Sequence, residues 1–297
     1  MKFSVIVPTY NRAPILHLFL QAMADQTLRD FEVVVVDDGS TDDTRQVAQS
    51  FPFVTYLEQP HRGTAALLNV GWRCSTGMLI LTSDDDCIGP PNWLESLADG
   101  FRRYPHVAAV GTYAAPPDHL LRTNRFARYD VWEWRHYGGL LIEYVGGSET
   151  PTAGLVAYKR QALEEVNGFN ENLAMAGAHD HDIKLRLTAR GYQFAYLPLK
   201  IDHYKEFTAQ SFWRQHVGRG RAAIRYEIVA TGHGPGHFRI GLRAIKQIAR
   251  LAENLIVLPD RMLAWTIFQA NCANCVGQWQ EQSAAKLSAA LPPPVQQ

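Results

Sequence analysis

Short apolar runs alternate with amphipathic segments over residues 3–112, and this alternation restricts the fold more than any other feature of the sequence. The apolar runs span residues 3–7, 31–36, 78–81 and 107–112, with a weaker run at 55–57. Between them, apolar residues recur at helical spacing over residues 13–24, 63–74 and 92–104. Strands that alternate with helices are typical of a mostly parallel sheet with helices on both faces. We therefore predict an α/β fold.

Carboxylates follow two of these predicted strands. Asp37 and Asp38 come directly after residues 31–36, and Asp84, Asp85 and Asp86 come soon after residues 78–81. Ligands of α/β sheets bind at the carboxyl ends of strands, and three consecutive carboxylates repel one another unless a cation or solvent relieves the repulsion. Mg²⁺ and Mn²⁺ prefer oxygen ligands and are commonly held by one or two carboxylates together with substrate phosphates. The sequence favours a divalent cation here, with a solvated acidic loop as the alternative.

The first two predicted strands also suggest a nucleoside site. We expect Thr9, Asp38 and the backbone amides near Gly39 to face one crevice, where a carboxylate can accept from ribose hydroxyls or a base N–H. Asp37 is as well explained as a turn residue. No GxxxxGK[ST] or GxGxxG element is present in the sequence, so P-loop and dinucleotide-oxidoreductase functions lose their main support.

Composition and the N-terminal sequence indicate which partners and which cellular compartment to expect. The 297 residues include 29 Lys and Arg against 29 Asp and Glu, so no global field favours a nucleic-acid partner. The N-terminal apolar run ends at Pro8 and is too short for a signal peptide, which predicts a cytoplasmic protein. The pair Cys272 and Cys275 has metal-ligand spacing, but no second pair accompanies it and apolar helix is the better interpretation.

Three separated motifs, in order, resemble the signature set of family 2 glycosyltransferases. They are V-I-V-P-T-Y-N-R (5–12), V-V-V-V-D-D-G-S-T-D-D-T (33–44) and D-D-D-C-I-G-P-P-N-W-L (84–94). Residues 154–160, 166–171, 179–187 and 191–198, together with His203, are similar to the acceptor half of that family. The resemblance covers residues 2 to about 225. It implies a GT-A fold, with a Rossmann-like donor half at 1–114 and an acceptor half at 115–225.

The resemblance also implies an activity: metal-dependent, inverting transfer of a sugar from a nucleoside diphosphate, most simply UDP, to a hydroxyl of a glycan or lipid-linked acceptor. A role in cell-surface polysaccharide synthesis and a Mn²⁺ or Mg²⁺ cofactor follow from it. The site residues that it implies fall into three groups. Donor binding is assigned to Pro8, Thr9, Tyr10, Arg12, Asp38, Asp84 and Asp85, metal binding to Asp86 and His203, and catalysis, as general base, to Asp180.

The acceptor half departs from the family pattern at His179, where a Glu usually precedes the catalytic Asp and contacts the acceptor. His179 is therefore an acceptor candidate. Trp132 and Trp134 are two more, because aromatic faces stack on the apolar faces of sugars, although packing of a helix core explains them equally well. For Asp180, the alternative to catalysis is a helix N-cap.

A helical extension is predicted for residues 226–290, followed by a disordered tail at 291–297. Within it, residues 238–258 carry a stripe of cations opposite an apolar face, which fits a surface helix or a helix lying on the inner face of a membrane. The apolar stretch at 262–277 is shorter than the ~20 residues of a membrane span. Peripheral membrane contact stays open.

Two other classes compete with a glycosyltransferase. A nucleotidyltransferase that makes a sugar nucleotide should carry a Gly-rich loop with Arg and Lys after the first strand, and P-T-Y-N-R lacks one. A non-catalytic relative that binds a nucleotide sugar or glycan would bind a donor without turnover, and the change at His179 keeps this alternative open.

Overall fold

The computed structural model describes residues 2–137, 143–147, 155–173, 178–258 and 260–290, and it divides into two compact units. The sheet unit comprises Met1–Leu120, Asp130–Ala174 and His179–Lys205, and the helical unit comprises Leu121–Tyr129, Met175–Ala178 and Glu206–Gln297. The predicted domain boundaries at residues 114 and 225 stay predictions; the compact helical unit includes the chain from Glu206 onward. The predicted tail at 291–297 lies outside the described residues.

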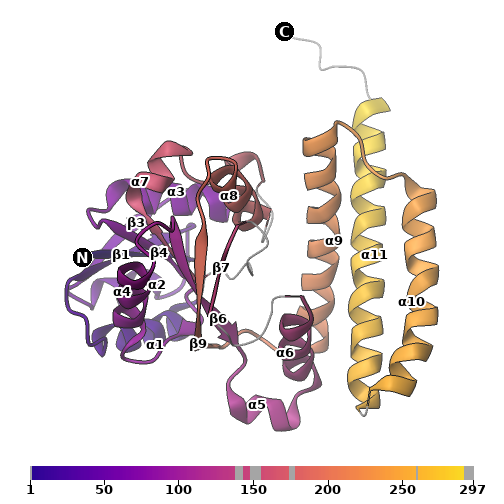
Figure 1. Ribbon diagram of the computed structural model, residues 1–297, viewed down its shortest axis with the longest axis horizontal. Helices are drawn as coiled ribbons and strands as arrows, with labels where there is room; N and C mark the ends of the chain where they lie inside the picture. The colour runs from indigo at the N-terminus through magenta and orange to yellow at the C-terminus, as the bar shows by residue number, and fades with distance from the viewer. Residues whose placement is uncertain (1, 138–142, 148–154, 174–177, 259, 291–297) are drawn as a thin grey trace. The chain divides into compact units, whose positions relative to one another are not determined.

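One mixed sheet organises the sheet unit (Figure 1). Its strand order is β3-β2-β1-β4-β8-β6-β9-β5, with β7 paired to β9. The strands are β1 (Phe3–Thr9), β2 (Phe31–Asp37), β3 (Val54–Glu58), β4 (Leu79–Thr82), β5 (Cys87–Ile88), β6 (Ala109–Ala115), β7 (Tyr144–Gly146), β8 (Val156–Lys159) and β9 (Phe194–His203). Strands β3, β2, β1 and β4 are parallel, as predicted. Beyond β4 the acceptor half adds antiparallel pairs, because β8 lies between β4 and β6 and runs opposite to both.

Helices cover both faces of this sheet because alternate residues of each buried strand point to opposite faces. Val5 and Val33 belong to the apolar cluster that includes residues of α1 (Ala13–Ala24) and α4 (Trp93–Arg103). Ile6 and Val34 belong to the cluster that includes residues of α3 (Thr64–Cys74), α7 (Arg160–Glu165) and α8 (Ala178–Thr188). The remaining short elements are α2 (Thr44–Gln49), α5 (Asp118–Thr123), α6 (Arg125–Tyr137) and the 3-10 turn η1 (Glu171–Leu173). The α/β fold class is thus confirmed.

The helical unit contains three long helices, α9 (Ala209–Thr231), α10 (His237–Val257) and α11 (Arg261–Ala290). Thr208 and Ser211 form a capping box at the start of α9, and Gly232 ends it in the left-handed conformation with φ of 80°. Helix α11 packs along both α9 and α10 (Figure 1). Its contact with α9 is close at Gly220 and Gly277, where an added Cβ would lie about 2 Å from a backbone oxygen of the other helix. None of the described helices is long and apolar enough to cross a membrane.

Candidate donor and metal site

The carboxylate loop joins β4 to β5 and meets the end of β9. All four residues of β4 are buried, so the strand is fixed in the sheet and the loop starts at its carboxyl end. Strand β5 pairs antiparallel with β9, which sets Cys87 opposite His203. The Tyr204 backbone N–H donates to the Asp86 carbonyl oxygen at 2.8 Å, which fixes the loop against the end of β9. Two segments that are far apart in sequence are thereby brought to one point.

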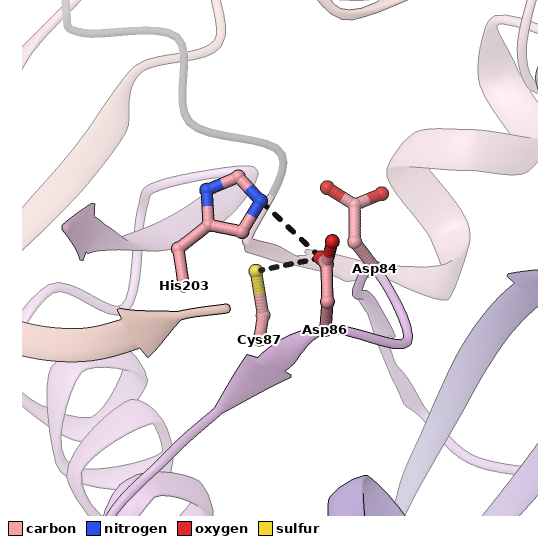
Figure 2. Close-up of side chains that lie close together, drawn as sticks. All are labelled: Asp84, Asp86, Cys87 and His203. Carbon is pink, nitrogen blue, oxygen red and sulfur yellow. Dashed lines mark hydrogen bonds and ion pairs between the residues drawn. The ribbon is translucent and has the colours of Figure 1, made fainter. Parts of the chain in front are cut away.

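Four side chains converge there: Asp84, Asp86, Cys87 and His203 (Figure 2). Each offers one ligand atom, and these atoms all lie within 4.8 Å of one another. His203 Nε2 is 3.2 Å from Asp86 Oδ1, and Cys87 Sγ is 3.9 Å from the same oxygen. The cluster unites the three predicted residues Asp84, Asp86 and His203, whereas Cys87 was not predicted as part of it. Only its place beside Asp86 in the sequence could have indicated it.

Arg12 fixes the carboxylate loop from the side of β1. Its guanidinium lies 2.9 Å from Asp85 Oδ1 and 2.7 Å from Asp86 Oδ2. The Thr9 hydroxyl donates to the other oxygen of Asp85 at 2.7 Å. Asp85 is buried, and both of its carboxyl oxygens have protein partners. In this structure Arg12 and Thr9, which were predicted to line a base pocket, hold the carboxylate loop in place.

The three carboxyl groups titrate differently because their surroundings differ. Burial raises the pKa of Asp85 to about 7, although Arg12 and Thr9 oppose the shift. Asp84 is accessible to solvent but crowded by protein, and desolvation, followed by the charge of Asp86, raises its pKa to about 6. Burial alone would raise the pKa of Asp86 as well, but His203 and Arg12 outweigh it and hold that pKa far below its usual range. Asp86 is therefore the carboxylate that stays ionised over the widest pH range.

A second group of polar side chains follows β2. Asp38 is buried, and it accepts from the Arg62 backbone N–H at 3.1 Å while its other oxygen lies 2.6 Å from His61 Nδ1. The His61 ring lies 5.8 Å from the ring of Tyr10, which is 49% exposed. His61 thus links an exposed aromatic ring to a buried carboxylate. His61 was not predicted, because no local pattern links it to Asp38.

Asp37 and Pro8 both lie in or at the end of a strand and contact neighbouring parts of the sheet unit. Asp37 is the last residue of β2 and is buried. It accepts from the backbone N–H and hydroxyl of Ser40 and from the Tyr56 hydroxyl, so its side chain stabilises the turn that follows the strand. Pro8 is part of β1, in register with Val36 of β2. Its role in a base pocket stays a prediction.

Asp180 lies in the first turn of α8, two residues after the helix begins. Desolvation raises its pKa above the ordinary value, with His179 and Lys184 opposing that shift, and its charge in turn raises the pKa of Asp84. The carboxylates of Asp84 and Asp180 are thus close enough to interact electrostatically. His179 is buried, with Nε2 at 3.4 Å from Asp180 Oδ1. Lys184 is also buried and was not predicted.

The aromatic acceptor candidates remain predictions. Trp132 lies on α6 with an intermediate exposure and takes part in contacts with other groups. Trp134 belongs to the same helix, but its side chain lies outside the described part of the structure.

A polar cleft of 330 Å³ lies between α3 and the turn that precedes η1. Asn69 ties its walls together, because its amide donates to Glu171 Oε1 at 2.9 Å and accepts from the Phe169 backbone N–H at 2.9 Å. Glu171 also lies 3.5 Å from the Arg62 guanidinium, next to the residues that hold Asp38. Glu171 therefore connects the wall of the cleft to the segment that carries Arg62.

Comparison with known proteins identifies the family. Residues 4–166 match the model described as glycosyl transferase family 2, which is more than half of the 297-residue chain. The chain belongs to glycosyl transferase family 2. Residues 135–210 of this glycosyl transferase also match a model described as the N-terminal domain of galactosyltransferase.

Two curated relatives span a similar part of this family 2 chain. An uncharacterized glycosyltransferase of Haemophilus influenzae is 38% identical over 208 residues, which cover 67% of this chain and 65% of that protein. The glucosyl-dolichyl phosphate glucuronosyltransferase of Haloferax volcanii is 25% identical over 202 residues, which cover 63% of each. The chain thus spans less than two thirds of the length of either relative.

Solved structures support the fold of this glycosyl transferase. The mannosyltransferase PcManGT from Pyrobaculum calidifontis superposes with a TM-score of 0.57 at 23% identity, covering 99% of this chain and 76% of that one. TarS 1-349 from S. aureus gives a TM-score of 0.56 at 17% identity, covering 97% and 92%. Both likenesses concern the fold, and they agree with the GT-A architecture expected from the motifs.

The cluster fits the divalent cation that is expected in such a glycosyl transferase. Two carboxylates and an imidazole are ligands that suit Mn²⁺, and the oxygen ligands also suit Mg²⁺. Asp86 is kept ionised, as a cation ligand must be. The Cys87 thiol is buried and its pKa is raised well above the ordinary value, so it is neutral and the hard carboxylate ligands dominate the site.

Proposed function

We propose that this chain is a metal-dependent, inverting glycosyltransferase that moves a sugar from a nucleoside diphosphate to a hydroxyl of a glycan or lipid-linked acceptor. The observation that carries the proposal is the convergence of Asp84, Asp86 and His203 within 4.8 Å at the carboxyl end of β4. Strands β2, β1 and β4 are parallel, so Asp38, which follows β2, and the cluster after β4 lie at the same end of the sheet. Ligands of α/β sheets bind at the carboxyl ends of the strands. The chain's family membership supports the reaction class.

The donor is a nucleoside diphosphate sugar, with UDP as the first nucleotide to test. PcManGT is described in complex with GDP-Man and Mn²⁺, and TarS in complexes with UDP and UDP-GlcNAc. In this chain the exposed ring of Tyr10 offers a stacking surface for a base, and Asp38 offers acceptor oxygens for ribose hydroxyls or a base N–H. Arg12 and Thr9 position the carboxylate loop, and their place in the base pocket stays part of the proposal.

Asp84, Asp86 and His203 are the residues that would hold the cation, which would offset the charge that develops on a diphosphate leaving group. For His203 to serve as a ligand, its Nε2 must be unprotonated. Arg12 remains beside Asp86 Oδ2, so it keeps the loop in place whether or not His203 keeps its bond to Asp86. Mn²⁺ and Mg²⁺ are both compatible with this ligand set.

Asp180 is the general base of the proposal. Single-displacement inversion needs a group that takes the acceptor's proton as its oxygen attacks, and a raised pKa makes a carboxylate a better base. The pKa of Asp180 is raised by desolvation, and the group interacts with Asp84 across the site. His179 lies beside it and is proposed to contact the acceptor. Trp132 and Trp134 remain further acceptor candidates.

The descriptions of two relatives support the proposed acceptor class. One relative is a glucosyl-dolichyl phosphate glucuronosyltransferase and another a chondroitin synthase, which suggests lipid-linked and glycan acceptors. We propose a role in cell-surface polysaccharide synthesis, with the chain in the cytoplasm at the inner face of the membrane.

The test is release of nucleoside diphosphate from UDP-, GDP- and dTDP-sugars, with Mn²⁺ or with EDTA, in the presence of candidate acceptors. The natural chain is compared with Asp86→Ala and Asp180→Asn, and Asp99→Asn, an exposed carboxylate on α4, is the matched control. We expect metal-dependent release that is lost in Asp86→Ala and about 10²–10⁴-fold slower in Asp180→Asn. Donor binding without release under any condition would favour the non-catalytic alternative, and failure to bind any donor would end the proposal.

A further inference from the structure

Helix α10 carries a stripe of large apolar side chains that face solvent. At about 100° per residue, Phe238, Ile245 and Ile256 fall almost in one line along the helix. Their side chains are 79%, 64% and 85% exposed. Leu242, Ile248 and Leu255 broaden the stripe, and each is at least 40% exposed. Six such residues on one helix are an exposed apolar patch of the kind that marks an interaction surface.

Other residues of α10 pack within the helical unit. Ile240 is 1% exposed, and Arg243 donates to the Gln278 side chain of α11 at 3.1 Å. The His237 ring contacts Trp279 of α11, with ring centroids 4.5 Å apart. Packing against α11 therefore fixes which side of α10 is turned outward, and the stripe lies on that outer side.

Cations lie along one border of the stripe. Arg239, Lys246 and Arg250 share a line that is about 100° round the helix from Phe238 and Ile245. The whole segment 206–297 holds ten Lys and Arg side chains but five Asp and Glu, an excess of five positive charges in a chain whose net charge is zero. The positive charge is thus concentrated in the part of the chain that bears the apolar stripe.

We infer that α10 docks this surface on a bilayer that contains anionic phospholipid, with the apolar stripe in the headgroup and acyl boundary and the three cations against lipid phosphates. An amphipathic helix with a cationic border binds such a surface through buried apolar area and electrostatic attraction together. A second copy that packs its α10 antiparallel on the stripe fits less well, because the two-fold axis of that contact would bring the two cationic borders to the same side. In this inference α10 lies on the membrane surface and does not span the bilayer, because one side of the helix is charged.

This surface is distinct from the proposed sugar-transfer site, and its test needs no donor. The full chain is floated with vesicles of phosphatidylcholine alone and with vesicles that contain 30% phosphatidylglycerol, a composition chosen for the assay. One variant combines Phe238→Ser, Ile245→Gln and Ile256→Gln, and another combines Arg239→Gln, Lys246→Gln and Arg250→Gln. Met78→Gln, at an exposed Met of the sheet unit, is the matched control. Circular dichroism verifies that each variant folds.

We expect binding to the anionic vesicles that exceeds binding to the neutral ones and weakens in high salt. The charge variant should bind on the order of 100-fold more weakly, since each cation near an anionic surface is worth about a fivefold change. The stripe variant should lose binding, whereas Met78→Gln should keep it. Equal binding to both vesicles, or unchanged binding by either triple variant, would overturn the inference. So would a dimer in sedimentation velocity that the stripe variant dissociates, because it would assign the stripe to a second copy.

Discussion

Arg12 is the residue whose removal should be most costly to the carboxylate loop. Arg12→Gln would leave the buried carboxylates of Asp85 and Asp86 without the guanidinium that lies 2.9 and 2.7 Å from them. Removing one partner of a buried ion pair costs 3–5 kcal/mol, and a single hydrogen bond to a charged group about 1.5–3 kcal/mol. Because the Arg12 side chain is 40% exposed, water takes over part of its role, and we expect a loss of about 2–3 kcal/mol at pH 8.

The cost should depend on pH in a defined direction. Asp85 has a pKa of about 7, so it is ionised at pH 8 and mostly protonated at pH 5. At pH 5 only Asp86 still needs the positive charge, and the loss should fall to about 1 kcal/mol. The assay is urea unfolding with EDTA at both pH values, and Mn²⁺ should stabilise Arg12→Gln more than the natural chain because it supplies the missing charge.

The control for Arg12→Gln is Arg45→Gln, which breaks an exposed ion pair with Glu58. We expect at most about 1 kcal/mol there, with little change between pH 5 and pH 8. If Arg12→Gln costs no more than Arg45→Gln, or costs the same at both pH values, the electrostatic account of the loop is wrong.

Two further predictions concern protonation and backbone strain. In the folded protein Asp84 and Asp85 have pKa values of about 6 and 7, above their values in the unfolded chain. The free energy of unfolding without metal should therefore fall as pH rises from about 4 to 7. The rise in melting temperature caused by Mn²⁺ should be larger at pH 8 than at pH 5. An equal Mn²⁺ effect at both pH values would contradict this. Gly168 has φ of 70°, and an added Cβ would lie 2.4 Å from the Asn69 amide oxygen, so Gly168→Ala should lower the free energy of unfolding by about 3 kcal/mol. Gly191→Ala, with φ of 85° and open space around it, isolates the backbone cost of about 1–2 kcal/mol, and equal losses in the two variants would refute the steric part.

The donor half could be predicted because local patterns determine it. The segment 13–24 was predicted as a helix and is α1 (Ala13–Ala24), and each of the first three strands differs from its prediction by two residues or fewer at either end. These elements have strong apolar periodicity and turn residues at their ends. The positions of Asp84, Asp86 and His203 in one cluster followed from the family resemblance rather than from periodicity.

The rest depends on pairings between distant segments. Strand β5 has two residues and no periodicity, yet its pairing with β9 is what brings Cys87 into the cluster. The bond between Arg12 and Asp86 joins residues 74 positions apart, so no local pattern could indicate it. The pair of His61 and Asp38 is likewise a product of tertiary structure. The packing of α9 against α11, which makes residues from Glu206 onward one compact unit, is likewise visible only in three dimensions.

The most direct test of the account is a calorimetric titration of the natural chain with UDP, GDP and dTDP, in Mn²⁺ and in EDTA, repeated with Asp86→Ala. If Asp84, Asp86 and His203 hold a cation that the diphosphate shares, at least one nucleotide should bind tenfold or more tightly with Mn²⁺ than with EDTA, and Asp86→Ala should abolish that gain. A nucleotide affinity that is the same with Mn²⁺ and with EDTA, or a Mn²⁺ effect that survives Asp86→Ala, would contradict the assignment of this cluster.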